Sequence, residues 1–296
     1  MSLPGIRFDG MAINQDQLLS WQFSRVTQSY TERDAIIYAL GIGLGENPLD
    51  KAELAYLIEG DLRVLPTMAV TLATLGMWVK EPALGIDWVR LVHAAQAATF
   101  HAPLPAKAEV YAKARITSVT DRGAGKGAVI TLERQIYNGA DDTLLCSLVQ
   151  TLLARGDGGF GGEPPPKAVP FVVPDRPPDV STSCETSPRA ALIYRLSGDL
   201  NPLHAVPEVA ARAGFERPIL HGLASYGIAG WVILRELCGS KPEALESLAL
   251  RFAGIVTPGD RLSFRLWREG NTVVFTAHAG DRLVLDQGVA QLKCWR

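Results

Sequence analysis

Residues 222–234 (GLASYGIAGWVIL) are apolar on every side of a helix, and this segment limits the folds open to the chain. A helix without a polar face must be buried. The segment is nevertheless shorter than the roughly 18 apolar residues that a membrane-spanning helix requires. Small residues recur along it, which would let neighbouring strands approach closely. We therefore expect a central helix wrapped by a curved sheet, and we expect residues 67–79 to form its counterpart earlier in the chain.

A weak internal repeat supports this division. When Tyr38 is placed on Tyr194, RDAIIYALGIG (33–43) lies over RAALIYRLSGD (189–199) with several identical residues. Each half then continues with an apolar, helix-like stretch and ends in alternating, strand-like segments, which are residues 108–117, 127–138 and 143–154 in the first half and 260–267, 272–279 and 284–293 in the second. A helix followed by strands that are joined by short turns indicates an α+β unit with an antiparallel sheet. We infer that one such unit has been duplicated and fused.

The boundary between the halves is marked by residues 154–179, which contain five glycines and seven prolines. Proline removes backbone donors and glycine adds chain entropy, so this stretch cannot be a continuous helix or a central strand. We expect an N-terminal unit over residues 1–153, a linker over 154–179 and a C-terminal unit over 180–296.

Composition excludes several classes of function. The 296 residues carry a net charge of −2, which excludes a general affinity for nucleic acid because such binding needs a basic face. No membrane-spanning segment appears, and residues 1–10 lack the apolar core of a signal peptide. The four cysteines (146, 184, 238 and 294) form no CxxC pair, which favours reduced structural thiols in a cytoplasmic protein and no zinc site.

The two halves differ at one loop. Under the repeat alignment, Asp199, Asn201 and His204 face Gly43, Gly45 and Pro48, so titratable groups stand only in the second half. Turn-forming residues end the preceding helix near Leu196, and Pro207 begins the next one. An irregular loop can turn Asp199 and His204 toward one point, where a carboxylate and an imidazole can hold and deprotonate one water. The alternative is a turn-capping Asp and an unrelated core or surface His.

This loop resembles the MaoC-like, or 2-enoyl-CoA hydratase 2, family. The matching segments are YRLSGDLNPLH (194–204), PEVAARAGF (207–215), PILHGLA (218–224) and RFAGIVTPGD (251–260). The layout of the whole chain is similar to the two-unit members, which include the hydratase part of the peroxisomal multifunctional enzyme. The resemblance implies a tandem, or double, hotdog fold, in which each unit wraps a long helix in an antiparallel sheet. It also implies a catalytic C-terminal unit and an N-terminal unit that has lost the motif and helps to bind the acyl chain.

The resemblance assigns roles residue by residue. The catalytic pair falls on Asp199 and His204, and the motif asparagine, Asn201, is expected to orient a catalytic side chain. The oxyanion donor falls on the backbone N–H of Gly222, and the start of a buried helix suits developing negative charge. The implied reaction is reversible syn hydration of a trans-2-enoyl-CoA to a (3R)-3-hydroxyacyl-CoA, without metal or redox cofactor. Which of the two residues is the principal base stays open, with Asp199 preferred.

Further residues are candidates for binding the substrate. They are Ser197, Gly198, His221 and Arg251. Arg251 and Lys293 are the two candidates for binding the CoA phosphates. For Arg251 and Lys293 the alternative is a solvated surface charge, and for His221 it is a hydrogen bond at the helix entrance. In the first half, His93 and Gln96 match part of a family segment. The aromatic residues Tyr30, Trp78 and Trp88 are expected either to line an acyl tunnel or to be plain core.

Three other readings remain open. The same loop could serve a dehydratase of a small branched or dicarboxylic acyl-CoA, which arginines in the acyl pocket would favour. A thioesterase is another hotdog function, although the loop argues against it. A non-catalytic acyl-thioester binding protein is the last. A homodimer is compatible with each, and residues 293–296 (KCWR) do not form a peroxisomal signal, so a cytoplasmic location is expected.

Overall fold

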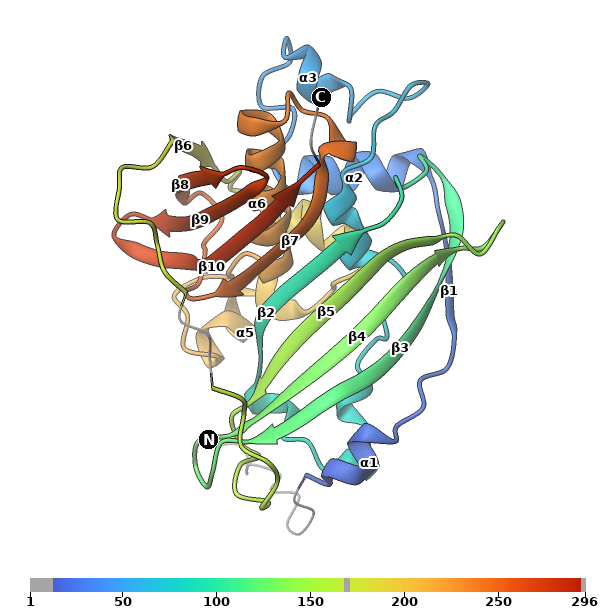
Figure 1. Cartoon of the computed structure of the whole chain (residues 1–296), viewed down its shortest axis with the longest axis vertical. Coiled ribbons are helices and arrows are strands. Elements are labelled where there is room, and N and C mark those ends of the chain that lie inside the picture. Colours follow the sequence, from blue (N-terminus) through green and yellow to red (C-terminus); the bar gives the residue numbers. More distant parts are fainter. Residues whose placement is uncertain (1–12, 168–170, 294–296) are drawn as a thin grey trace.

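The computed structural model describes residues 13–167 and 171–293, and the expectations about a leader (1–10), Cys294 and the C-terminal residues 294–296 fall outside these ranges. The described strands form one ten-stranded antiparallel sheet (Figure 1). In spatial order, its strands are β1 (Val26–Tyr30), β3 (Ala108–Asp121), β4 (Ala128–Asn138), β5 (Leu144–Ala154), β2 (Leu91–Phe100), β7 (Leu245–Phe252), β10 (Arg282–Leu292), β9 (Thr272–Ala279), β8 (Arg261–Glu269) and β6 (Val180–Glu185).

The sheet contains the same strand order twice. The order β1-β3-β4-β5-β2 in the first half corresponds to β6-β8-β9-β10-β7 in the second, and the two halves meet where β2 pairs with β7, with Ala97 opposite Ala249. The alternating segments anticipated from the sequence all lie in strands. The expected α+β tandem is therefore confirmed, and its two sheets are continuous.

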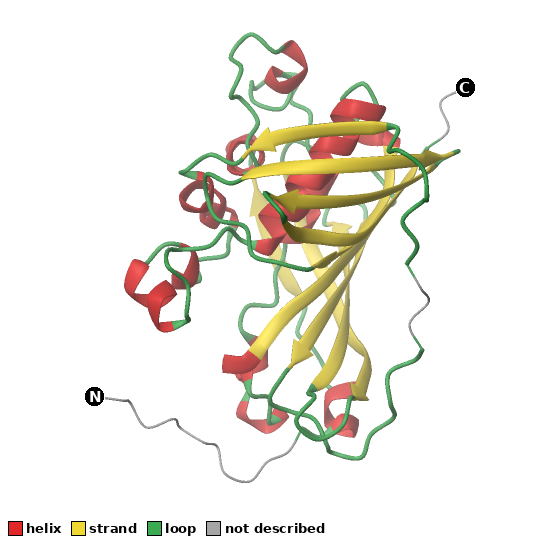
Figure 2. Ribbon diagram, turned by 90° about the vertical axis from the view of Figure 1, so that its left-hand side faces the viewer, coloured by secondary structure: helices red, strands yellow, loops and turns green. Residues whose placement is uncertain are grey.

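The apolar segment of the second half forms the long helix α6 (Gly222–Leu237), and all its residues from 224 to 234 are buried. Strands of the second half curve around it (Figure 2). The small residues of α6 admit partners from the first half as well as from the sheet. A Cβ on Gly227 would lie 2.5 Å from the Tyr38 hydroxyl, and one on Gly230 would lie 2.5 Å from Thr67.

Short helices fill the connections. The α-helices are α1 (Gln15–Leu19), α2 (Glu32–Gly41), α3 (Lys51–Leu54), α4 (Ala190–Tyr194) and α5 (Pro207–Arg212), and the 3₁₀ turns are η1 (Pro66–Thr71), η2 (Trp78–Lys80), η3 (Pro82–Leu84), η4 (Trp88–Arg90), η5 (Arg195–Ser197), η6 (Pro202–His204) and η7 (Pro242–Ala244). Helices α2 and α4 pack together, and the repeat-equivalent Tyr38 and Tyr194 rings lie 5.9 Å apart. Among the described residues, no helix has the length and apolar character needed to cross a membrane.

The expectation of a long helix over residues 67–79 is wrong. The 3₁₀ turn η1 forms at its start, and a second one, η2, begins only at Trp78. Between them Leu72 is extended, and Ala73 has a φ of +44°, which ends the helical path. The amide of Ala73 donates to Gln28 instead of to a helical carbonyl (2.6 Å). Proline at the start and the β-branched Thr67, Val70 and Thr71 disfavour an α-helix, whereas burial suits a compact turn.

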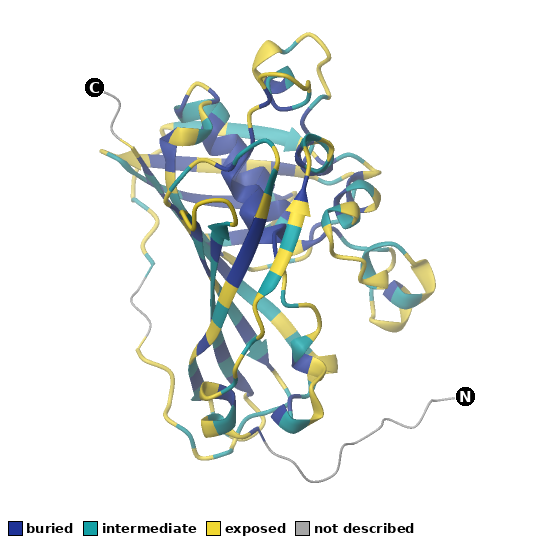
Figure 3. Cartoon of the chain, turned by 90° about the vertical axis from the view of Figure 1, so that its right-hand side faces the viewer, coloured by how far each residue is buried: buried dark blue, intermediate teal, exposed yellow. Residues whose placement is uncertain are grey.

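Buried residues line the concave side of the sheet and the α6 helix (Figure 3). They form two hydrophobic clusters. The larger one surrounds α6 and reaches Ile136 and Leu148, whereas the smaller one lies toward the far end of β3–β5 and includes Leu132 and Leu152. The described residues between Ala154 and Val180 form neither helix nor strand, as their proline and glycine content predicts.

Candidate functional site

The loop between α4 and α5 is held in an irregular path. After η5, Gly198 has a φ of +114°, a left-handed conformation that glycine adopts without a steric penalty. The following η6 is capped by the Asn201 side chain, which accepts the N–H of Leu203 at 3.1 Å. The loop thus reverses twice within a few residues, and it carries Asp199 and His204 to the start of α6.

The loop brings three titratable side chains together. One ligand-type atom from each of Asp199, His204 and His221 lies within 4.8 Å of the other two. The Asp199 carboxylate is exposed, and its Oδ1 accepts the backbone N–H of Asn201 at 3.1 Å. His204 is partly buried, and its Nδ1–H donates to the Ile219 carbonyl at 2.8 Å. This hydrogen bond leaves the lone pair of His204 Nε2 available.

Asn201 acts differently from the expectation. Its side chain caps η6, so it does not touch either member of the Asp199–His204 pair through a hydrogen bond that the described residues show. Its backbone N–H is the group that fixes the Asp199 carboxylate. Asparagine suits both tasks because its short amide closes a local turn while its main chain stays in the extended region.

His221 is the third member of the cluster, and it makes a hydrogen bond at the entrance of α6, as the structural alternative anticipated. It occupies the N-cap position of α6 without a side-chain cap. Its Nε2–H instead donates to the Asp199 carbonyl oxygen at 3.1 Å. Its ring stacks on that of His204, with centroids 3.7 Å apart and planes 28° apart. His221 therefore braces both ends of the loop.

Burial keeps these imidazoles neutral. Desolvation lowers the pKa of His204, opposed by its hydrogen bond to Ile219 and by the Asp199 charge. Desolvation and the neighbouring His204 lower the pKa of His221 to about 4. Near neutral pH, both rings thus offer an unprotonated nitrogen, and among the described residues His221 Nδ1 has no hydrogen-bond partner.

Two histidines and a carboxylate could in principle hold a divalent cation. His204 Nδ1 and His221 Nε2 already donate to carbonyl oxygens, so each ring has one nitrogen left. The arrangement suits a water molecule better, since the Asp199 carboxylate and His204 Nε2 are both acceptors and a water has two hydrogens to donate.

Gly222 begins α6 directly after His221. The first N–H groups of a helix have no intrahelical acceptor and lie at the positive end of the helix dipole. A Cβ on Gly222 would lie 3.4 Å from the Phe252 ring, so a side chain here would narrow the space beside these N–H groups. The start of α6 therefore presents backbone N–H groups directly after His221.

The remaining candidates differ in their relation to this loop. Ser197 and Gly198 belong to it, and the partly buried Ser197 Oγ has no partner among the described residues. Arg251 is paired with Asp286 at 2.7 Å. Lys293 is exposed, and its backbone N–H donates to Ala244. Neither Arg251 nor Lys293 contacts the loop of Asp199 and His204 through an interaction that the described residues show.

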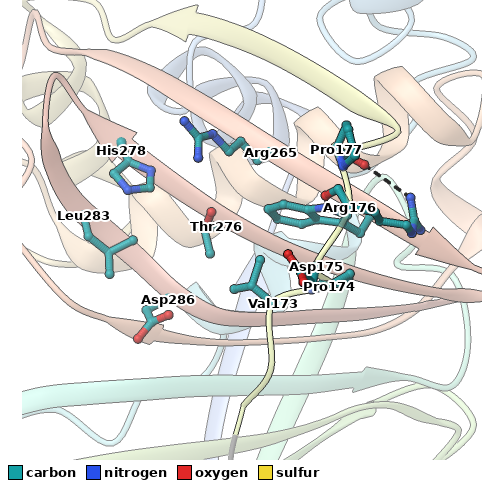
Figure 4. Close-up of a pocket in the computed structure, with 11 residues that line it drawn as sticks. Val173, Pro174, Asp175, Arg176, Pro177, Arg265, Thr276, His278, Leu283 and Asp286 are labelled. Atoms are coloured by element: carbon teal, nitrogen blue, oxygen red, sulfur yellow. Dashed lines mark hydrogen bonds between the residues drawn. The ribbon is translucent and has the colours of Figure 1, made fainter.

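A groove of about 660 Å³ lies on the outer side of β8–β10, beneath residues 173–177 (Figure 4). Its lining includes Arg265, His278 and Asp286. No candidate site residue lines it. Because Asp286 holds Arg251, the arginine is tied to the rim of this groove rather than to the loop of Asp199.

In the first half, His93 does approach the loop. Its ring centroid is 5.0 Å from that of Phe252, the same ring that faces Gly222. Burial lowers the pKa of His93 to about 4, and the Asp199 charge acts on it in the opposite direction. Gln96 is buried beside it and donates to the Ala97 carbonyl at 2.8 Å. His93 and Gln96, which match part of the family segment, thus lie beside the loop of Asp199.

The three aromatic residues considered for a tunnel have other contacts. Tyr30 is buried and donates to Pro105, Trp78 packs edge-on against Phe23, and Trp88 lies under Lys80. Sequence reasoning missed Arg134 on β4, whose side chain donates to the Val70 carbonyl at 2.7 Å. The alternation Ala128, Ile130, Leu132, Arg134, Ile136 was the available signal, because it places an arginine on the inward face.

Comparison with known proteins relates both halves to one family. Residues 28–156 match the family model described as the MFE-2 hydratase 2 N-terminal domain, and residues 170–288 match the MaoC-like domain. An enoyl-CoA hydratase of Mycobacterium tuberculosis, ChsH3, is 38% identical over 92% of this chain and 95% of its own. The peroxisomal enoyl-CoA hydratase 2 of Arabidopsis thaliana is 37% identical over 91% of this chain and 92% of its own. The crystal structure of a MaoC-like dehydratase from Phytophthora capsici superposes with a TM-score of 0.82 at 29% identity, over 95% of this chain and 99% of that one.

Proposed function

The chain belongs to the MaoC-like, 2-enoyl-CoA hydratase 2 family, and we propose that it adds water reversibly across the C2=C3 bond of trans-2-enoyl-CoA thioesters. The product is a (3R)-3-hydroxyacyl-CoA, which makes the protein a hydro-lyase. The observation that carries this proposal is the pair of proton acceptors, the Asp199 carboxylate and the lone pair of His204 Nε2, beside the start of α6.

Asp199 and His204 position the attacking water. The water donates one hydrogen to the carboxylate and the other to His204 Nε2, so an oxygen lone pair is left pointing away from both. The lowered pKa of His204 supports its role as an acceptor, because a protonated ring could not receive this hydrogen. Asp199 is the principal base and His204 its partner in this proposal.

Gly222 makes the double bond electrophilic. Its N–H hydrogen-bonds the thioester carbonyl oxygen, and the negative charge that develops there during attack on C3 is stabilised by the helix start. As the C3–O bond forms, one water proton passes to the base. The base lies on the face of the double bond from which the water attacks, and it returns that proton to C2 on the same face. One H and one OH are thus added, and no atom is left over.

The remaining roles follow from this site. The chain divides into an N-terminal unit (1–153), a linker (154–179) and a catalytic C-terminal unit (180–296). The N-terminal unit forms the wall for the acyl chain. The substrate is the acyl-CoA thioester, and no bound cofactor takes part. We also propose a cytoplasmic homodimer. Cell fractionation and mass measurement in solution test the location and the oligomeric state.

The central experiment follows the loss of enoyl-thioester absorbance with crotonyl-CoA and longer trans-2-enoyl-CoAs. We expect turnover by the wild type, a (3R) product on chiral analysis, and a loss of about 10²- to 10⁴-fold in Asp199→Asn and in His204→Ala. Asp61→Asn, at an exposed carboxylate, is the matched control. Near-normal turnover by Asp199→Asn would refute the pair, and a wild type inert toward every enoyl thioester would refute the function.

A further inference from the structure

A row of polar side chains separates the two hydrophobic clusters in the first half. On β4, Arg134 shares the inward face with Leu132 of the smaller cluster and Ile136 of the larger one. On β5, Gln150 lies in the same way between Leu152 and Leu148. Across the ladder, Gln150 is opposite Leu132 on one side and opposite Gln96 on the other. The core is therefore interrupted by Arg134, Gln150 and Gln96 on three neighbouring strands.

Arg134 lacks a counter-charge. Its one hydrogen bond goes from Nη2 to the Val70 carbonyl, and among the described residues its buried Nε has no partner. None of the ion pairs between described residues includes it. A guanidinium has five N–H donors, and leaving a charge in a protein interior without an anion is unfavourable. The side chain thus has the capacity to receive an anion with two parallel hydrogen bonds.

Arg134 is only partly closed off from solvent. Its Nε is buried, and burial lowers the pKa of the guanidinium to about 10. The residue nevertheless keeps accessible surface, as His93 does, whereas Leu132, Ile136 and Leu148 are closed off. Part of this charged side chain is therefore reachable from solvent.

Two sets of interactions connect Arg134 with the loop that carries Asp199 and His204. On one side, Val70 holds Arg134, and the next carbonyl, that of Thr71, lies 4.0 Å from a Cβ placed on Gly198. On the other side, the Arg134 and Asp199 charges both act on His93, whose Nδ1 lies 3.4 Å from Gln150 Nε2. Arg134 therefore lies near the loop of Asp199, on the first half's side of the site.

From this placement we infer that the acyl chain of the substrate carries a carboxylate beyond C3 and that Arg134 binds it. The inference rests on the proposed hydratase function and narrows its substrate class to acyl-CoA thioesters with a second, anionic end. A carboxylate matches the free guanidinium donors in both charge and geometry. An apolar chain of the same length would leave the charge without a partner.

The alternative is that Arg134 only caps the C-terminal end of η1 through Val70, as cations at helix ends do. The test must therefore measure preference between substrates rather than overall activity. It compares trans-2-enoyl-CoAs with the same chains ending in a carboxylate, for the wild type, Arg134→Gln and Arg134→Lys. Arg115→Gln is the matched control, because Arg115 is an exposed arginine on the next strand, paired with Glu133.

We expect the wild type to have a higher kcat/KM for a carboxylated chain than for its uncharged equivalent. Arg134→Gln should lower this ratio about 10- to 100-fold, with Arg134→Lys in between, because lysine keeps the charge and loses the fork. Arg115→Gln should leave the ratio unchanged. Preference for uncharged chains at every length, or an equal loss for both series in Arg134→Gln, would overturn the inference.

A binding measurement separates this inference from the proposed function. Titration calorimetry with saturated acyl-CoAs, with and without a terminal carboxylate, requires no turnover. Tighter binding of the carboxylated ligand that is lost in Arg134→Gln supports the role of Arg134 even if no enoyl thioester is hydrated. Equal binding of both ligands by the wild type contradicts it even if hydration is observed.

Discussion

The imidazole rings of His204 and His221 stack with centroids 3.7 Å apart. A different backbone carbonyl holds each ring. His204 donates to the Ile219 carbonyl, and His221 donates to the Asp199 carbonyl. Protonation of one ring disfavours protonation of the other at this separation, so the stack stays neutral. The pair thus holds the loop in place and keeps an acceptor nitrogen toward the proposed water.

We predict that His221 is a positioning residue. His221→Phe keeps a flat ring against His204 but loses the hydrogen bond to Asp199, which should lower kcat about tenfold with little change in KM. His221→Gln restores a donor and should recover part of the loss. Steady-state kinetics on both variants provides the measurement, and a rise in KM at unchanged kcat would assign His221 to substrate binding instead.

At Gly222, a single methyl group should impair catalysis without harming the fold. In Gly222→Ala the added Cβ lies 3.4 Å from Phe252, a tolerable contact, and alanine is a better helix former than glycine. The methyl group nevertheless crowds the N–H that is proposed to donate to the thioester oxygen, so we expect kcat to fall about 10²-fold. Thermal unfolding serves as the control for folding. Unchanged kcat would remove Gly222 from the oxyanion site.

The pH dependence of activity should reflect neutral His204. Its pKa is lowered by burial, so the ring remains unprotonated as the pH falls through about 6.5, the ordinary value for histidine. We expect kcat/KM to hold through that value and to decline only at lower pH. A decline centred above it would show that His204 is not desolvated in the working enzyme.

Stability should depend on pH through the other buried histidines. The pKa values of His93 and His221 are about 4 in the folded chain and about 6.5 in an unfolded one. The unfolded chain therefore binds more protons between these values, and stability is full above about 6.5 and is lost progressively as the pH falls toward 4. Across this window, the melting temperature of His93→Gln should change less steeply with pH than that of the wild type. An identical slope in the variant would contradict the role of His93.

Chelation should leave the activity unaffected. The Asp199 carboxylate and His204 Nε2 are two acceptors that match the two hydrogens of a water, so the Asp199, His204 and His221 cluster is expected to work with water alone. Extended dialysis against a strong chelator, followed by the hydration assay, checks this. Loss of activity that is restored by one particular divalent metal would establish a metal site at this cluster.

Local patterns predicted most of the architecture. Alternation located three strands in each half, and the apolar segment at 222–234 located α6, because each pattern reflects which faces are buried. Alternation did not locate β1, β2, β6 or β7. The same reasoning failed at residues 67–79. Apolar character there indicates burial, which is correct, but the backbone path depends on the left-handed Ala73 and its bond to Gln28, a partner distant in sequence.

The site was predictable only in part for a similar reason. The spacing of Asp199 and His204 within one loop could be read locally, whereas the roles of their supports could not. Asn201 acts through two hydrogen bonds within its own turn, a choice of main-chain and side-chain partners that residue type alone does not specify. His221 contacts a loop 22 residues away, which is a tertiary contact. The alternation along β4 could have placed Arg134 inward, but its missing counter-ion is a property of the assembled core.

The pairing of β2 with β7 has a consequence for how such a chain evolves. Two separate identical subunits joined along this edge would have to carry every mutation twice, once on each side of the symmetry axis. Here one polypeptide supplies both edges, so each half accumulates changes independently. Under the proposed function, the first half could lose the Asp199–His204 pattern without altering the second half, because a mutation in one half is not copied into the other.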